Sequence, residues 1–246
     1  MAYSTDLRAG VGRLRSDERA RWLSSGWRGG FTETRAAYNV SVPDGWPEVD
    51  LDAYGAERRE RAGFEDGPTL FTGVDARHAR CARLGPVTCL ATAGVSNPAA
   101  LPVGEATPTD DADTAVDSVE GSSDSSREPP GTVNVLLGTT TALTDGALAG
   151  LLGVAVEAKT ATLLATTGFP GTTTDAAVVG CRVRETPDPF AGSATEVGGA
   201  ARACVREAVR ASLDSRYSED GWAVPGSVEA AKYGLSTTAR ADVFVP

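Results

Sequence analysis

The chain has 246 residues, of which 41% are hydrophobic and 23% charged, a composition typical of a globular protein with enough apolar side chains for a core. Its longest apolar stretch, residues 147–156, ends before Glu157 and Lys159. Because a bilayer requires roughly 20 such residues, we expect no membrane span. With 23 basic and 33 acidic side chains, the net charge of −10 opposes binding to nucleic acid.

The N-terminus and the choice of basic residues indicate where the protein works. No basic region followed by an apolar run opens the chain, so we expect no secretory signal and a cytoplasmic location. Lys159 and Lys232 are the only lysines, and all other basic residues are arginines. An acidic, lysine-poor chain rich in alanine and glycine indicates a high-salt cytoplasm, such as that of a haloarchaeon, where screening tolerates surplus charge.

Cysteine and histidine are scarce, which limits the chemistry. No two cysteines form a C-x-x-C pair, and we expect free buried thiols at Cys81, Cys89, Cys181 and Cys204. His78 is the single histidine and stands in a basic, polar stretch, so we expect it at the surface. A zinc site of several histidines is excluded, and a Ser-His-Asp triad would have to use His78.

In the first part of the chain, the pattern predicts short strands separated by turns. The expected strands are residues 21–25, 38–42, 69–74 and 87–93. The glycine-rich residues 26–30 form a turn after the first of them. The charges of Asp50 to Gly63 are spaced as on a solvated helix.

A change in composition at residues 105–130 separates the two parts. This stretch has no aromatic residue and is rich in Asp, Glu, Ser, Thr and Pro. It cannot bury enough apolar surface to become ordered, and its carboxylates lack the spacing of a calcium loop. We therefore expect a disordered acidic insertion within a single domain of residues 1–246.

The second part mixes strands and helices. We predict strands at 132–138 and 178–183, a helix from Asp145 to about Thr166 capped by Thr144, and a helix over 196–213. Strands and helices do not alternate regularly. The predicted fold class is α/β or α+β, with mixed β-sheet layers packed with helices in a single domain.

Five polar segments lie at predicted strand ends or on the central helix, where folds of this kind collect their sites. Each segment alone also fits the usual composition of turns. The segments are Ser24–Gly30, Thr92–Asn97, Gly131–Asn134, Glu157–Thr160 and Thr166–Asp175.

Together, and in this order, these segments resemble the adenosylcobinamide amidohydrolase family. Residues 92–97 match its T-A-G-x-S-N motif, 131–135 its G-T-I-N-I, and 157–160 most of its T-E-A-K-T. Val156 replaces the threonine of the last motif, and residues 168–172 are longer than the compact family loop before Asp175. The resemblance implies hydrolysis of the amide that joins the aminopropanol arm to the corrin ring, giving adenosylcobyric acid for cobalamin (vitamin B12) biosynthesis by corrinoid salvage.

On the segments of this resemblance, we predict catalytic roles for Glu157, Thr160, Lys159 and Asp175. Glu157 is the expected general base acting on water. Residues 157 and 159 lie about 200° apart on a helix, so Glu157 shares a pocket with Thr160 while Lys159 holds a carboxylate such as Asp175. If the helix ended before Glu157, an extended segment would place Glu157 and Lys159 on one side.

The same resemblance indicates the substrate-binding residues. The turn of residues 24–30 would let the backbone approach a large flat ligand whose face Trp27 covers. Asn97 and Asn134 would offer amide donors to the oxyanion or to side-chain amides of the corrin. The full predicted set is Ser24, Trp27, Gly29, Gly30, Ser96, Asn97, Thr132 and Asn134.

Three alternatives stay open at the level of sequence. The chain could be a non-catalytic corrinoid-binding or carrier module. It could cleave itself before Thr132 and use the new N-terminus as nucleophile. It could also be a hydrolase that holds Mg²⁺ or Mn²⁺ with carboxylates alone. We expect no cofactor and no bound metal. The expected partner molecule is a corrinoid, and the sequence leaves the oligomeric state open.

Overall fold

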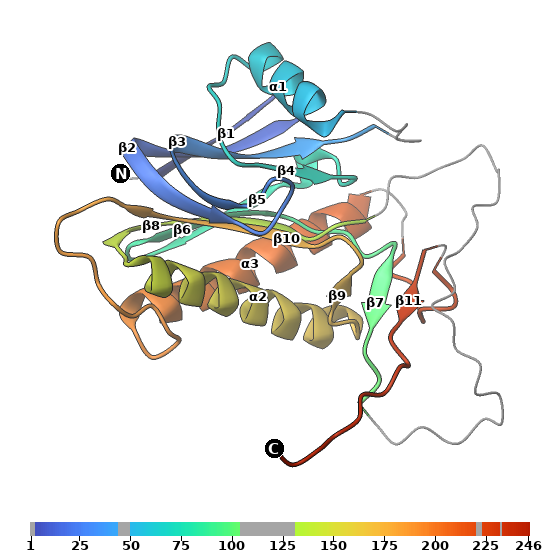
Figure 1. The fold of residues 1–246 in the computed structure, drawn as a ribbon. Coiled ribbons are helices and arrows are strands. Elements are labelled where there is room, and N and C mark those ends of the chain that lie inside the picture. Colours follow the sequence, from blue (N-terminus) through green and yellow to red (C-terminus); the bar gives the residue numbers. More distant parts are fainter. Residues whose placement is uncertain (1–2, 44–49, 104–130, 220–222, 232) are drawn as a thin grey trace.

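The computed structural model describes residues 3–43, 50–103, 131–219, 223–231 and 233–246 (Figure 1). Within them, an eight-stranded sheet has the order β4-β3-β2-β10-β8-β6-β5, and β1 pairs with β2 beside this path. A smaller sheet has the order β11-β7-β9. The predicted insertion at 105–130 lies outside the described residues.

The bounds of the elements follow. The large sheet consists of β1 (Tyr3–Arg8), β2 (Val11–Ser24), β3 (Gly30–Ser41), β4 (Thr69–Thr72), β5 (Arg80–Leu84), β6 (Val87–Thr92), β8 (Asn134–Ala142) and β10 (Ala176–Arg182). The small sheet consists of β7 (Pro98–Ala100), β9 (Gly171–Thr172) and β11 (Leu235–Ser236). The helices are α1 (Leu51–Arg61), α2 (Asp145–Thr167), α3 (Glu196–Glu219) and the short 3₁₀ turn η1 (Ala76–His78).

Strand directions bring several strand ends together. β8 and β10 run parallel, with Asn134 beside Ala176. β6 runs antiparallel to β8, so its last residue, Thr92, also lies beside Asn134. β2 runs antiparallel to β10 and ends at Ser24, opposite Val178. We call the edge where β2 and β6 end and β8 and β10 begin the polar edge.

Alternating side chains of the central strands fill two cores. Val135 and Leu137 of β8 pack with α2 and α3 on one face. Leu136 faces the opposite way and packs with Trp22 of β2. Figure 1 shows β2 and β3 above the central strands and α2 and α3 below them. Sheet layers packed with helices in a single domain confirm the predicted fold class.

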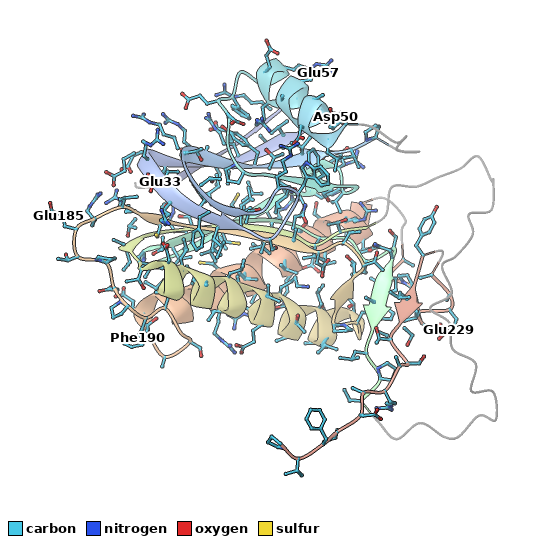
Figure 2. The ribbon with its side chains drawn as sticks, in the orientation of Figure 1. Glu33, Asp50, Glu57, Glu185, Phe190 and Glu229 are labelled. Atoms are coloured by element: carbon cyan, nitrogen blue, oxygen red, sulfur yellow. The ribbon has the colours of Figure 1, made fainter. Side chains whose placement is uncertain are left out.

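The helix ends follow from local chemistry. Thr144 caps α2 by accepting a hydrogen bond from the Ala147 backbone N–H, as predicted. α2 ends at Gly168, whose φ of 79° suits glycine. Asp50 caps α1 in the same way, and α1 lies over a third core that contains Tyr38. Figure 2 shows the acidic side chain of Glu57 on α1 pointing away from the body.

α2 corrects the expectation about membrane-spanning length. Among the described helices, it is the one long and apolar enough to cross a membrane by length and composition alone. The uninterrupted apolar stretch ends before Glu157, but the helix itself continues to Thr167, close to its predicted end at about Thr166. Half of its most apolar 18-residue window is buried inside the protein, as in the core helix of a globular domain.

Two other expectations about exposure are wrong. His78 is 1% exposed, because the η1 turn directs the imidazole inward to Ser215 of α3, at 3.0 Å between Nδ1 and Oγ. Cys81 is exposed because β5, which the sequence pattern did not predict, lies at the edge of the sheet. The other three cysteines are free and buried, as expected.

β1 was not predicted either, and the expected strand 21–25 is only the end of the 14-residue β2.

Two glycine substitutions test the packing of β2 on the central sheet. A Cβ at Gly180 would lie 2.3 Å from the buried Trp22 ring, so Gly180→Ala should lower the free energy of unfolding by about 1–3 kcal/mol. Gly150→Ala is the control, because a Cβ there meets nothing within 4 Å and alanine favours a helix by up to about 1 kcal/mol. Denaturant unfolding in high salt measures both. Equal stability of the two variants would contradict this packing.

Candidate active site

The carboxylate of Asp175, directly before β10, is the centre of the polar edge. Its Oδ1 accepts hydrogen bonds from the Val133 backbone N–H at 2.9 Å and from the Thr172 hydroxyl at 2.5 Å. Its Oδ2 accepts from the Thr172 backbone N–H at 3.1 Å and from the Lys159 ammonium. Four donors from α2, β9 and the start of β8 therefore meet on one carboxylate.

Lys159 is the cation paired with Asp175. Its side chain is 9% exposed and that of Asp175 12% exposed, so the ion pair is largely shielded from water. The pair needs glycine at position 171, because a Cβ there would lie 2.7 Å from Asp175 Oδ2 and 3.1 Å from Lys159 Nζ. The structure thus contains the pairing of Lys159 with Asp175 that the sequence suggested.

Hydroxyls join the neighbouring segments. The Thr132 and Thr174 hydroxyl oxygens lie 2.9 Å apart, at the starts of β8 and β10. The Gly131 backbone N–H donates to Ser96 Oγ at 2.6 Å, and the Gly94 N–H donates to the Thr132 carbonyl at 3.3 Å. The segments after β6 and before β8 therefore lie side by side. Three of the five predicted polar segments meet here, and α2 contributes Lys159 from a fourth.

Asn97 and Asn134, both predicted as donors to the substrate, donate hydrogen bonds within the protein. Asn97 Nδ2 donates to Thr173 Oγ1 at 2.6 Å. Asn134 Nδ2 donates to Asn39 Oδ1 and to the Phe71 carbonyl, both at 2.8 Å. Their Oδ1 atoms are buried and accept no hydrogen bond from the described residues. Asn134 thus uses both of its N–H groups within the protein, which leaves none for the substrate, whereas Asn97 uses one of its two.

Asn39 on β3 belongs to the site, and sequence reasoning missed it. Its Nδ2 donates to Thr92 Oγ1 at 2.8 Å, while its Oδ1 accepts from Asn134. Asn39 is 2% exposed and lies on the same face of β3 as Ala37, toward the central strands. The available signal was an asparagine inside a run of five consecutive buried residues, Ala36–Val40, in a strand.

The turn of residues 24–30 starts at the polar edge and leaves it. Ser24 is buried, and its Oγ accepts from the Gly26 N–H at 3.2 Å. Trp27 is 52% exposed and its indole N–H donates to Asp52 of α1 at 3.0 Å. Trp27 lines a pocket of about 680 Å³ between α1, β3 and β4, whose lining does not include Lys159.

The glycines of this turn have reasons of their own. A Cβ at Gly29 would lie 2.4 Å from the Ser24 carbonyl oxygen, and Gly30 has a φ of +114°. Both therefore serve the turn itself. Their predicted contact with substrate stays a prediction.

Glu157 does not lie with Lys159 and Asp175. Its side chain is 59% exposed on α2 and pairs with Arg202 of α3. Because α2 is continuous to Thr167, the rotation of about 200° between residues 157 and 159 separates their side chains, and the extended alternative is wrong. Thr160 is half-buried on α2. The expected pocket of Glu157 and Thr160 with a water-activating carboxylate is not supported by this placement.

Neither His78 nor Cys89 is placed to act as a nucleophile or base here. Arg77 Nε donates to His78 Nε2 at 3.1 Å, so the proton of a neutral ring is on Nδ1 and faces Ser215 Oγ. His78 in this form cannot take a proton from Ser215. Burial raises the pKa of the Cys89 thiol well above its ordinary value, which keeps it protonated. In the described ranges, no three His, Cys, Asp or Glu side chains gather as metal ligands.

Comparison with known proteins identifies first a class, the amidohydrolases. The curated "Adenosylcobinamide amidohydrolase" of Halobacterium salinarum is 51% identical over 247 residues, covering 99% of this chain and 100% of the relative. A protein of the same name from Methanosarcina mazei is 26% identical over 205 residues, 79% of this chain and 90% of the relative. The crystal structure of the PH0078 protein from Pyrococcus horikoshii has 13% identity and a TM-score of 0.41, covering 85% of this chain and 78% of that one.

The family model described as adenosylcobinamide amidohydrolase (CbiZ) matches residues 7–221. The chain belongs to this family. The matched range contains all five polar segments and Asn39. The resemblance drawn from the short motifs is thereby confirmed.

Two carboxylate-to-amide substitutions separate the buried carboxylate from the exposed one. Asp175→Asn deprives Lys159 of its counter-ion and should cost about 3–5 kcal/mol of stability, as breaking a buried pair does. Turnover should fall about 10²-fold because the polar edge loses its geometry. Glu157→Gln should change stability by less than about 1 kcal/mol, since its ion pair is exposed, and leave turnover near that of the parent chain.

Unfolding curves and initial rates measure both variants. A fall in turnover of about 10²-fold in Glu157→Gln would show that Glu157 is the general base after all.

Proposed function

We propose that this protein hydrolyses the amide between the aminopropanol arm and the corrin ring of adenosylcobinamide, giving adenosylcobyric acid and aminopropanol in corrinoid salvage. Membership of the family over residues 7–221 and the 51% identical relative support the reaction. The observation that carries the location is the meeting of the motif segments around the Lys159–Asp175 pair. The polar edge is therefore the proposed active site.

The reaction defines what this edge must do. The oxygen of water bonds to the carbonyl carbon, the C–N bond breaks, and the leaving nitrogen takes up a proton. Negative charge develops on the carbonyl oxygen, and a buried cation stabilises it more strongly than one in water. Lys159 is the proposed oxyanion-side cation, and Asp175 is a positioning residue, because its four acceptor sites are already filled. The Thr132 and Thr174 hydroxyls are proposed to pass protons.

The second candidate is a corrinoid carrier without chemistry, which would use the same edge for binding alone. A lysine held in a shielded ion pair favours the enzyme, because burying an ammonium and a carboxylate is costly unless function requires them there. We also propose a cytoplasmic location for this chain. Its similarity to the Halobacterium salinarum protein agrees with the high-salt habitat indicated by composition.

Incubation with adenosylcobinamide in high salt tests the reaction. We expect equimolar aminopropanol and adenosylcobyric acid by chromatography, in the presence and absence of EDTA. Binding without release of aminopropanol would establish the carrier. Loss of activity in EDTA, restored by Mg²⁺ or Mn²⁺, would establish the metal-dependent alternative.

The intact chain should carry the activity, in contrast to the self-cleaving alternative. The bond between Gly131 and Thr132 is held on both sides, by Gly131 N–H on Ser96 and by the Thr132 carbonyl on Gly94. Denaturing mass spectrometry of an active sample should show one species of 25.3 kDa. Two fragments that meet at this bond, together with loss of cutting and turnover in Thr132→Ala, would prove self-cleavage.

A further inference from the structure

We infer that Asn134 and Asn97 are hydrogen-bond acceptors toward the substrate, so that the site selects ligands that present N–H groups and discriminates against carboxylates. This inference rests on the proposed function. It states that the polar edge accepts hydrogen bonds from a corrinoid through these two residues. It reverses the donor role that the motifs alone suggest.

The polarity of Asn134 is fixed by a backbone carbonyl. The carbonyl of Phe71 can only accept, so the Asn134 atom 2.8 Å from it must be the Nδ2 donor. The same Nδ2 donates its second hydrogen to Asn39 Oδ1. Asn39 is in turn oriented by its own donation to Thr92 Oγ1. Asn39 is thus a positioning residue that keeps the Asn134 oxygen as the unengaged group.

Both oxygens lack a donor in a buried setting. Asn134 is 1% exposed and Asn97 0% exposed, and neither Oδ1 accepts a hydrogen bond within the described residues. Native proteins leave few buried polar groups unsatisfied, since each carries a desolvation penalty. Both acceptors lie within motif segments of the polar edge, which indicates that a donor from outside the chain completes them.

The chemistry of an amide matches this set of groups. An amide offers a carbonyl oxygen and an N–H, while the edge offers the Lys159 ammonium and the two asparagine oxygens. The carbonyl therefore belongs with Lys159 and the N–H with an asparagine oxygen. Carboxamides on the rim of a corrin present the same N–H donors. A carboxylate presents none and is repelled by the amide oxygens.

Asn97 offers a matched pair of variants. Its Nδ2 contacts Thr173, whose hydroxyl can donate as well as accept, so Asn97→Asp keeps this contact and keeps an acceptor for the substrate. Asn97→Leu has a similar shape and keeps neither. For an acceptor, we expect KM within about 3-fold of the parent in Asn97→Asp and raised about 10-fold or more in Asn97→Leu. For a donor, Asn97→Asp would be at least as damaging as Asn97→Leu.

A second measurement does not depend on the folding of variants. Absorbance titration of the parent chain in high salt compares two corrinoids with the same ring and upper ligand, one bearing carboxamides and the other carboxylates. We expect at least about 10-fold tighter binding of the carboxamide form. Asn97→Leu, with an unchanged melting temperature, should reduce this preference, whereas general repulsion by the acidic chain would leave it unchanged.

Three results would overturn the inference. The first is an equal rise of KM in both Asn97 variants. The second is a KM like that of the parent in both variants, which would mean that a buried water alone completes the oxygen. The third is equal affinity of the parent for the two corrinoids. Failure of the proposed function is a different result, because a parent chain that releases no aminopropanol still reports its preference in the titration.

Discussion

The shielded carboxylate of Asp175 is the interaction on which the polar edge depends. It collects a backbone N–H from Val133, two donors from Thr172 and the ammonium of Lys159. β8 and β10 are parallel neighbours, and α2 is the long connection that packs below them. One side chain therefore fixes the start of both strands and the helix between them. An ionised acceptor forms stronger hydrogen bonds than a neutral one, which suits a junction of several elements.

The contacts at this junction show which motif glycines the fold itself requires, as distinct from glycines that would make room for a ligand. Gly171 leaves room for the Lys159–Asp175 pair, and a Cβ at Gly131 would lie 2.7 Å from backbone atoms of Gly94 and Ser96. These glycines are explained by contacts within the chain. The hydroxyl and amide side chains beside these glycines are not needed to let the neighbouring segments approach each other closely. The polar side chains of the motifs are therefore better candidates for binding than their glycines.

The elements that sequence predicted well have local causes, and the rest have tertiary ones. The Thr144 cap and the length of α2 follow from neighbouring residues, and the scarcity of lysine singled out Lys159. The position of Asn39 depends on how β3 lies across the central strands, which no local period reveals. Glu157 shares a motif with Lys159, yet helical rotation turns it to Arg202. A motif indicates which segment matters, but not which of its side chains faces the site.

The distribution of donors and acceptors determines which groups of a ligand the polar edge can bind. The carbonyl of Phe71 orients Asn134, and Asn39 holds it, so the asparagine oxygen is left where the motif alone suggested a nitrogen. The charged donor that pairs with Asp175 at this edge is the ammonium of Lys159. An edge that offers the Lys159 ammonium and amide oxygens complements a neutral amide. After hydrolysis, the ring carries a carboxylate without an N–H, so the product loses the contacts that held the substrate and its release is favoured.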